Sequence, residues 1–249
     1  MPKLFLTGDI LPADRQHTLG IGTGSKFRQT GGEHWYTFFE QFDKNDSILF
    51  GNLEAPLVSS TIKNQCNKDF FAGDETFSKW LSRAGFDVVS VANNHILEFG
   101  EAGFHHTVQA LQNDGIETVG IFDDLHGSNL SIIKKENCTF GFAAFNAVHD
   151  IQNDDCYASL SEKAVKHAID GLRKREVDLI CLSFHWGNEY IHIPSWEQVQ
   201  LARKAIDWGA DLIIGHHPHV VQPVEQYKQG WILYSLGNFI FDMNWSRNV

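Results

Sequence analysis

The sequence of 249 residues is short of positive charge, with 20 lysines and arginines against 31 aspartates and glutamates and a formal net charge of −11. Sequence-independent binding to nucleic acid depends on clustered lysine and arginine side chains that displace counterions from phosphates. The acidic balance therefore argues against a nucleic-acid partner. An anionic substrate would need a local positive centre on this protein, such as a metal ion.

Long hydrophobic runs are also missing. Polar residues or glycine interrupt every apolar segment within about ten residues, whereas a membrane-spanning helix needs about 18 apolar residues. The N-terminus has only Leu4-Phe5-Leu6 before polar residues begin, which is too short for the apolar part of a signal peptide. The sequence predicts no membrane span and a cytoplasmic location.

Cysteine is scarce, and no two of the four cysteines form a C-x-x-C pair. A disulfide framework or a thiolate zinc site would need paired spacings, so we expect reduced, structural thiols. Histidine, by contrast, occurs thirteen times and gathers in short segments flanked by turn residues. This distribution points to imidazole chemistry.

Short apolar runs alternate with helix-like segments along the chain. Five runs are predicted as strands that each stop at polar residues: 3–7, 47–50, 87–91, 177–183 and 211–214. Helices are predicted over 75–84, 100–113, 161–175 and 195–209, and further strands, some antiparallel, over 129–135, 139–145 and 231–236. The alternation predicts an α/β fold with a largely parallel central sheet. Because no linker or repeat interrupts it, we expect one domain over residues 1–249.

Residues 12–32 are polar, rich in glycine and without a sustained period. A stretch of this kind is typical of a surface loop, and long loops are often functional. We therefore assign it no regular structure.

Polar side chains follow each of the five predicted strands. They are Asp9; Asn52 and Glu54; Asn93, Asn94 and His95; His185; and His216, His217 and His219. Each alone has an ordinary explanation, such as an Asx turn for Asp9, a helix cap for Asn93 and Asn94, or a packed core histidine for His185. Together they supply carboxylate, amide and imidazole ligands at one edge of the sheet, a set too rich for one tetrahedral zinc. The conjunction predicts two divalent cations.

These segments, in this order, resemble the CapA/poly-γ-glutamate capsule-synthesis family, a branch of the calcineurin-like metallophosphatases. The resemblance rests on Gly8-Asp9, Gly51-Asn52-Leu53-Glu54, Asn93-Asn94-His95, His185-Trp186-Gly187, the 215–219 segment Gly-His-His-Pro-His, and the 234–239 segment Tyr-Ser-Leu-Gly-Asn-Phe. It spans about residues 3–242 and implies a four-layer αββα sandwich with a dinuclear site at one edge.

The resemblance also implies roles for individual residues. Asp9 and His219 would hold the first metal, while Asn94, His185 and His217 would hold the second. Glu54 or Asn52 would bridge or complete the set, and we favour Glu54 because a carboxylate neutralises two cations better than an amide. His95 would stand outside the metals and face the substrate as the catalytic residue. Asn52, His216 and Asn93 are additional candidates, and the expected metals are one or two ions of manganese, zinc or iron.

The sequence departs from the wider superfamily in three places. Leu11 stands where a second histidine usually follows the first aspartate, so the first metal lacks a ligand unless Asp14 or His17 replaces it. The chain stops at Val249, so we expect the family's closing strands to be shortened or absent. Many relatives carry an N-terminal membrane anchor, and we expect none in this sequence.

The leading hypothesis is a metal-dependent hydrolase of a phosphodiester or phosphomonoester linked to capsule, poly-γ-glutamate or another surface polymer, with a phosphoester or anionic polymer as substrate. The alternative is an accessory protein of polymer assembly that keeps the fold without catalysis, which Leu11 favours. A metal-dependent amidohydrolase is less favoured, because those folds usually place their His-x-His early in the chain and here it comes late.

Overall fold

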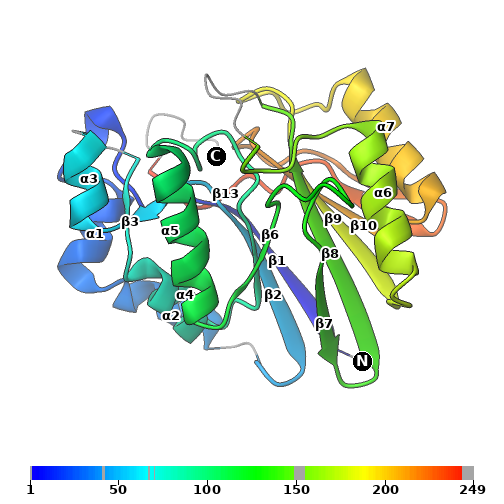
Figure 1. The fold of residues 1–249 in the computed structure, drawn as a ribbon, viewed down its shortest axis with the longest axis horizontal. Helices are drawn as coiled ribbons and strands as arrows, with labels where there is room; N and C mark the ends of the chain where they lie inside the picture. The colour runs from blue at the N-terminus through cyan, green and yellow to red at the C-terminus, as the bar shows by residue number, and fades with distance from the viewer. Residues whose placement is uncertain (1, 41–42, 67, 70, 149–154, 243–249) are drawn as a thin grey trace.

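The computed structural model describes residues 2–40, 43–66, 68–69, 71–148 and 155–242, which form two β-sheets packed face to face between helices (Figure 1). In the first sheet the strand order is β13 (Asn238–Ile240), β1 (Lys3–Ile10), β2 (Ser47–Leu53), β5 (Val88–Ser90) and β6 (Glu117–Val119). In the second it is β11 (Val224–Tyr227), β12 (Gly230–Leu233), β10 (Leu212–His216), β9 (Leu179–His185), β8 (Cys138–Asn146) and β7 (Ser131–Lys135). A further short pair joins β3 (Leu57–Val58) to β4 (Gly73–Asp74).

Strand direction brings the functional ends together. Every pair in the first sheet is parallel, and so are β8 with β9, β9 with β10 and β10 with β12 in the second. The two edge strands β7 and β11 are antiparallel to their neighbours. The carboxyl ends of the parallel strands in each sheet therefore lie at a common edge, where ligands of α/β proteins usually bind.

Three apolar layers hold the sandwich together. Between the sheets, Ile48 and Phe50 of β2 pack with Phe142 and Ile214 from the second sheet. Leu49 points to the other side of β2, into the cluster under the helices, as the two-residue period of a strand requires. Strands covered on both faces are continuously apolar, which is why all of β2 is buried.

Helices cover the outer face of each sheet. The first sheet carries α2 (Glu33–Phe39), α4 (Phe77–Ala84) and α5 (Gly100–Asn113), and the second carries α6 (Glu162–Arg173) and α7 (Trp196–Trp208), as Figure 1 shows. The remaining helices are η1 (Gln16–Thr18), α1 (Thr23–Thr30) and α3 (Ser60–Cys66). The four-layer arrangement implied by the resemblance is confirmed. The single central sheet predicted from the alternation alone is wrong, because local apolar runs do not show which strands pair.

The segment 12–32, for which no regular structure was expected, contains η1 and α1. A buried carboxylate organises it: Asp14 accepts hydrogen bonds from the backbone N–H and the hydroxyl of Ser25, at 2.8 and 2.5 Å, and from Gly20 N–H at 3.2 Å. Arg28 pairs with the same carboxylate at 3.0 Å. These tertiary contacts, rather than a hydrophobic period, determine the local structure.

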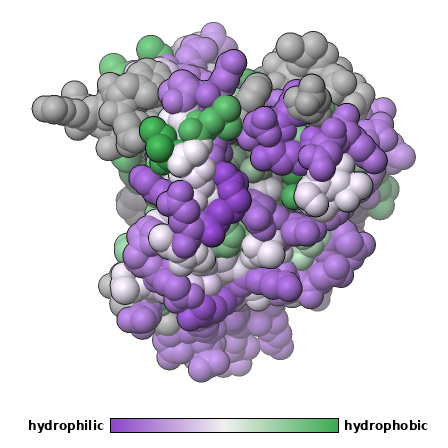
Figure 2. Space-filling view, turned by 90° about the vertical axis from the view of Figure 1, so that its left-hand side faces the viewer, coloured by the Kyte–Doolittle hydropathy of each residue, from purple (hydrophilic) through white to green (hydrophobic). Residues whose placement is uncertain are grey.

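The face that carries α1 and α3 is mostly hydrophilic, with hydrophobic residues in small groups (Figure 2). None of the helices in the described part of the chain combines the length and the apolar character that crossing a bilayer requires.

Candidate metal centre

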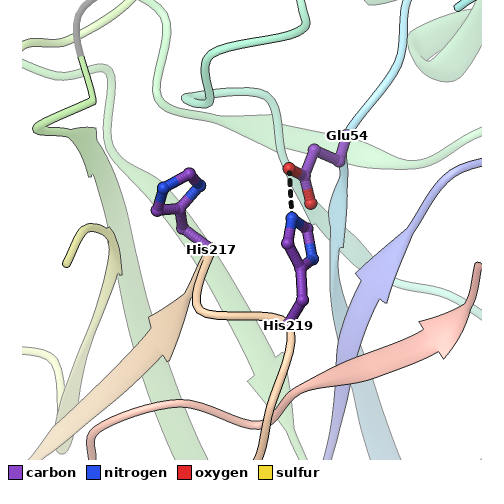
Figure 3. Close-up of side chains that lie close together, drawn as sticks. All are labelled: Glu54, His217 and His219. Atoms are coloured by element: carbon purple, nitrogen blue, oxygen red, sulfur yellow. Dashed lines mark ion pairs between the residues drawn. The ribbon is translucent and has the colours of Figure 1, made fainter. Parts of the chain in front are cut away.

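The polar residues predicted from the strand ends gather at one edge of the sandwich. Asp9 lies near the end of β1, Glu54 follows β2 directly, and His185 ends β9. His217 and His219 lie in the loop after β10, opposite Glu54, and Figure 3 shows the Glu54 carboxylate directed at the His219 ring. Both histidines adopt left-handed backbone conformations, with φ of 95° and 58°. Such strain in non-glycine residues persists where the surrounding structure imposes it, as at functional sites.

Glycines allow the backbone to approach closely beside these residues. A Cβ on Gly8 would lie 2.0 Å from the Gly237 carbonyl oxygen, and one on Gly215 would lie 1.9 Å from that of Tyr234. The close approach lets Asp9 N–H donate to Gly237 O at 2.9 Å. The glycines of the Gly-Asp and Gly-His-His motifs therefore position the strand ends themselves.

Two groups of side chains could each hold a metal ion. The first is Glu54 with His217 and His219, and the second is Asp9 with Glu54 and His185; in each, the ligand atoms lie within 4.8 Å of one another. All five residues are buried. Glu54 belongs to both groups, the position expected of a bridging carboxylate. In these groups His217 would share a metal with His219, and Asp9 would share one with His185. The resemblance implied instead that Asp9 shares a metal with His219, and His185 with His217.

The unsatisfied hydrogen-bonding capacity of Glu54 is consistent with a role as a metal ligand. Within the described residues neither of its carboxylate oxygens makes a hydrogen bond, although the side chain is fully buried. The imidazole nitrogens nearest to it are His219 Nε2 at 3.6 Å and His185 Nε2 at 3.7 Å, both beyond hydrogen-bond length. Burying an unsatisfied carboxylate is costly, and a divalent cation between it and the imidazoles would remove that cost. Carboxylate and imidazole are common ligands of zinc, manganese and iron.

The ionisation of the cluster depends on burial and on neighbouring charges. Burial, aided by the charge of Asp9, raises the pKa of Glu54 well above its usual range. Burial also lowers the pKa of His217 to about 4 and that of His185 well below its usual range, so both imidazoles are neutral near pH 7 and available as ligands. For His219 the desolvation effect is outweighed by Glu54 and Asp9, which raise its pKa to about 9.

Asp9 is held by several donors around it. Asn52 Nδ2 donates to its Oδ1 at 2.9 Å, His216 Nδ1 lies 2.9 Å from the same oxygen, and His217 N–H donates to Oδ2 at 3.2 Å. Burial acts to raise the pKa of Asp9, but the contacts with His216 and His219 outweigh it and hold the pKa well below its usual range. Asn52 and His216 thus orient a candidate ligand, as residues that surround metal sites do.

The side chains of the Asn93-Asn94-His95 turn make different contacts. Asn93 donates to Leu53 O at 2.8 Å and to Asn52 Oδ1 at 3.3 Å, so it supports the strand end. Asn94 Oδ1 lies 2.8 Å from His185 Nε2 and therefore faces the ligand cluster. This distance places the amide oxygen beside one of the two candidate ligand nitrogens of His185.

His95 belongs to neither ligand group. Its Nδ1 lies 3.2 Å from Glu98 Oε1, and its ring stacks on Phe71 with a centroid distance of 4.4 Å. Lys68 binds the other oxygen of Glu98 at 3.1 Å. Sequence reasoning did not identify Glu98, although its position three residues after His95 on the same chain segment is a signal that could have suggested the contact.

Leu11 is fully buried in a small apolar cluster with Ala13 and Ala55, against Phe71 and Phe241. Neither Asp14 nor His17 belongs to a ligand group among the described residues. Asp14 is engaged with Ser25 and Arg28 instead. Two further residues that were not among the predicted site residues lie beside the cluster. Asn238, in the 234–239 motif, has its Oδ1 2.8 Å from His219 Nδ1, and the Tyr190 ring lies 6.4 Å from the His219 ring.

Comparison with known proteins gives consistent family matches. Residues 3–243 match the family described as bacterial capsule synthesis protein PGA_cap. The capsule biosynthesis protein CapA of Bacillus anthracis is 34% identical over 230 residues, 87% of this chain and 56% of that protein. The PGA biosynthesis protein CapA of Bacillus subtilis (strain 168) is 31% identical over 235 residues, 88% of this chain and 60% of that protein. The chain thus spans less than two thirds of the length of these relatives.

More distant similarities agree with these matches. A probable polyglutamine synthesis accessory protein of Mycobacterium tuberculosis (strain ATCC 25618 / H37Rv) is 29% identical over 175 residues, 62% of this chain and 45% of that protein. A solved structure of a hypothetical protein from Thermus thermophilus superposes with a TM-score of 0.54 at 16% identity, covering 94% of this chain and 75% of that one. At this identity the superposition supports the fold alone.

Proposed function

The chain belongs to the bacterial capsule synthesis protein family PGA_cap, and from this premise we propose that it is a metal-dependent hydrolase of a phosphomonoester or phosphodiester. The substrate would belong to capsule, poly-γ-glutamate or other surface-polymer metabolism, in line with the names of its relatives. The observation that carries the proposal is the buried carboxylate of Glu54, shared by two ligand groups and without a hydrogen bond among the described residues.

The residues of the centre have distinct tasks in this proposal. Asp9, Glu54, Asn94, His185, His217 and His219 would hold one or two divalent cations of manganese, zinc or iron. When bound, such cations polarise phosphoryl oxygens and lower the pKa of water that attacks the phosphorus. Asn52, His216 and Asn93 keep the ligands in place through the hydrogen bonds described above.

His95 would act as the general acid. Glu98 occupies its Nδ1, so Nε2 is the nitrogen that can give a proton to the leaving oxygen. Stacking on Phe71 fixes the plane of the imidazole, and Nε2 lies 3.3 Å from the amide nitrogen of Asn94, from which it accepts in the neutral ring. To act as the acid, His95 would carry a proton on Nε2 and exchange this contact for one with the leaving oxygen. The arrangement places a proton donor beside the metal ligands without making it one of them.

A specific observation favours a second candidate, an accessory protein of polymer assembly. Leu11 places an apolar side chain where a further ligand would complete the first metal, and the mycobacterial relatives carry the word accessory in their names. Such a protein would keep the fold and a metal without turning over a substrate.

One experiment separates the two candidates. The protein is purified without added metal, its metal content is measured by inductively coupled plasma mass spectrometry, and monoester and diester substrates are assayed with and without Mn²⁺. The hydrolase proposal expects one to two cations per chain and turnover that chelation abolishes. Bound metal without cleavage of any phosphoester would contradict it and favour the accessory role. The His167→Ala variant, which removes an exposed histidine on α6, serves as the control and should behave like the parent protein.

A further inference from the structure

Arg15 lies in the glycine-rich segment 12–32, and its backbone is held firmly. The Arg15 N–H donates to Thr18 Oγ1 at 2.9 Å and to Asp242 Oδ2 at 3.4 Å. The Thr18 hydroxyl also donates to Asp242, and the neighbouring Asp14 binds Ser25 as described above. A loop fixed by two buried carboxylates presents its arginine in a defined place.

The Arg15 side chain lies beside Tyr190, whose ring lies 6.4 Å from the ring of the candidate ligand His219. Its Nη1 atom is buried, and its guanidinium donates a hydrogen bond to the Tyr190 hydroxyl. Burial is the main influence on the pKa of Glu54 and raises it, and the positive charge of Arg15 acts in the opposite direction. The carboxylate oxygens of Glu54 nevertheless accept no hydrogen bond from any described residue, so the guanidinium stands apart from them.

Tyr190 is itself fixed to the loop that carries two metal ligands. Its N–H donates to the carbonyl oxygen of Pro218, the residue between His217 and His219, at 2.8 Å. Its backbone has a φ of 62°, a left-handed conformation that is unusual for an aromatic residue. The hydroxyl donates to the exposed carboxylate of Glu189, which turns its oxygen lone pairs toward Arg15.

We propose that Arg15, positioned by Tyr190, forms an anion subsite beside the metal centre that binds the non-reacting oxygens of a phosphoryl group. The inference rests on the proposed function and names the substrate group that the site would orient. A guanidinium has five N–H donors in a planar fork whose spacing matches two oxygens of one phosphate. In a chain with a net charge of −11, this held cation beside the acidic ligands is the local positive group that an anion requires.

The test measures binding of inorganic phosphate to the full chain loaded with Mn²⁺, by isothermal titration calorimetry. Arg15→Gln should weaken phosphate binding by about 10- to 100-fold, the usual effect of losing charge-assisted hydrogen bonds, while metal content stays unchanged. Arg15→Lys keeps the charge without the fork and should give an intermediate loss. Tyr190→Phe should weaken binding less than Arg15→Gln. Arg83→Gln removes an exposed arginine paired with Glu33 and should leave phosphate affinity as it is.

The outcomes separate this subsite from the proposed hydrolase activity. The subsite proposal would be overturned if the parent and Arg15→Gln bound phosphate equally well, or if the parent bound no phosphate. Turnover of phosphoesters by the same samples would still support the hydrolase proposal. Loss of metal from both Arg15 variants would also overturn it, because Arg15 would then support the ligands rather than the substrate. Binding of phosphate that depends on Arg15 in a protein that cleaves no phosphoester would support the subsite and contradict the hydrolase.

Discussion

The two sheets contribute different chemistry to the same edge of the molecule. The first sheet and its loops carry the candidate oxygen ligands, namely Asp9, Glu54 and the amide of Asn94, whereas the second carries the candidate imidazole ligands His185, His217 and His219. Each candidate ligand group includes residues from both sheets. Neither sheet could therefore bind a cation in the proposed way alone, and the centre depends on how the two halves pack.

The packing between the sheets is separate from the candidate ligands. Away from the edge, the interface is an apolar layer that includes Phe50 and Phe142, stacked with a centroid distance of 5.8 Å. Ridges of apolar side chains fix the relative position of the sheets, and the polar ligands occupy only the carboxyl ends of the strands. The apolar layer thus sets the distance across which Glu54 faces the histidines.

The largest expected effect comes from removing the one ligand that both groups share. Glu54→Gln keeps the shape of the side chain and removes its charge, so we expect nearly all metal and all metal-dependent turnover to be lost. His217→Ala affects one group and should lose most of the metal held there, while Asp9, Glu54 and His185 remain. Metal content after gel filtration, measured with the His167→Ala control, distinguishes the two. Equal losses in both variants would show that the groups do not act as separate sites.

A smaller effect should follow from changing His95, the imidazole that follows β5 of the first sheet. His95→Asn should lower turnover by about 10²–10⁴-fold, the usual loss for a general acid, with metal content and folding unchanged. The neighbouring Asn94→Ala should lower metal content and turnover together, because Asn94 faces His185 and His95 does not ligate. If His95→Asn releases metal, the assignment of roles within the turn is wrong, and unchanged turnover on activated and unactivated esters would exclude His95 as the acid.

The sequence was sufficient to predict the strands that carry the ligands. Runs such as 211–214 end abruptly at polar residues, and the structure places β10 over Leu212–His216. The helices predicted over 100–113 and 195–209 correspond to α5 and α7, the latter with Ser195 as N-cap and Gly209 in the left-handed conformation after its end. These signals are local, so a single sequence contains them.

Features that depend on tertiary contacts could not be predicted in this way. The helix α1 has few apolar residues and depends on Asp14 binding Ser25, which no local pattern shows. The combination of His217 with His219 depends on how the second sheet faces Glu54. Arg15 meets Tyr190 through tertiary contacts of its loop, including the hydrogen bond of its N–H to Asp242, so neither its spacing nor its neighbours in sequence indicated it.

The smallest of the expected effects tests whether a cation joins the two halves. A ligand that binds only the folded chain stabilises it by about 2.7 kcal/mol at 100 times its dissociation constant. For a chain of this size that corresponds to a rise in Tm of about 5–10 °C. Calorimetry of the chelated protein with and without Mn²⁺ should show this rise, and Glu54→Gln should abolish it because that variant lacks the shared ligand. The chelated parent should remain folded, since the apolar layer with Phe50 and Phe142 does not involve the metal ligands. Unfolding on chelation would mean that the metal, and not this layer, holds the sheets together. An unchanged Tm at saturating Mn²⁺ would mean that the cation does not bind preferentially to the folded chain, in which the carboxylates of one half face the imidazoles of the other.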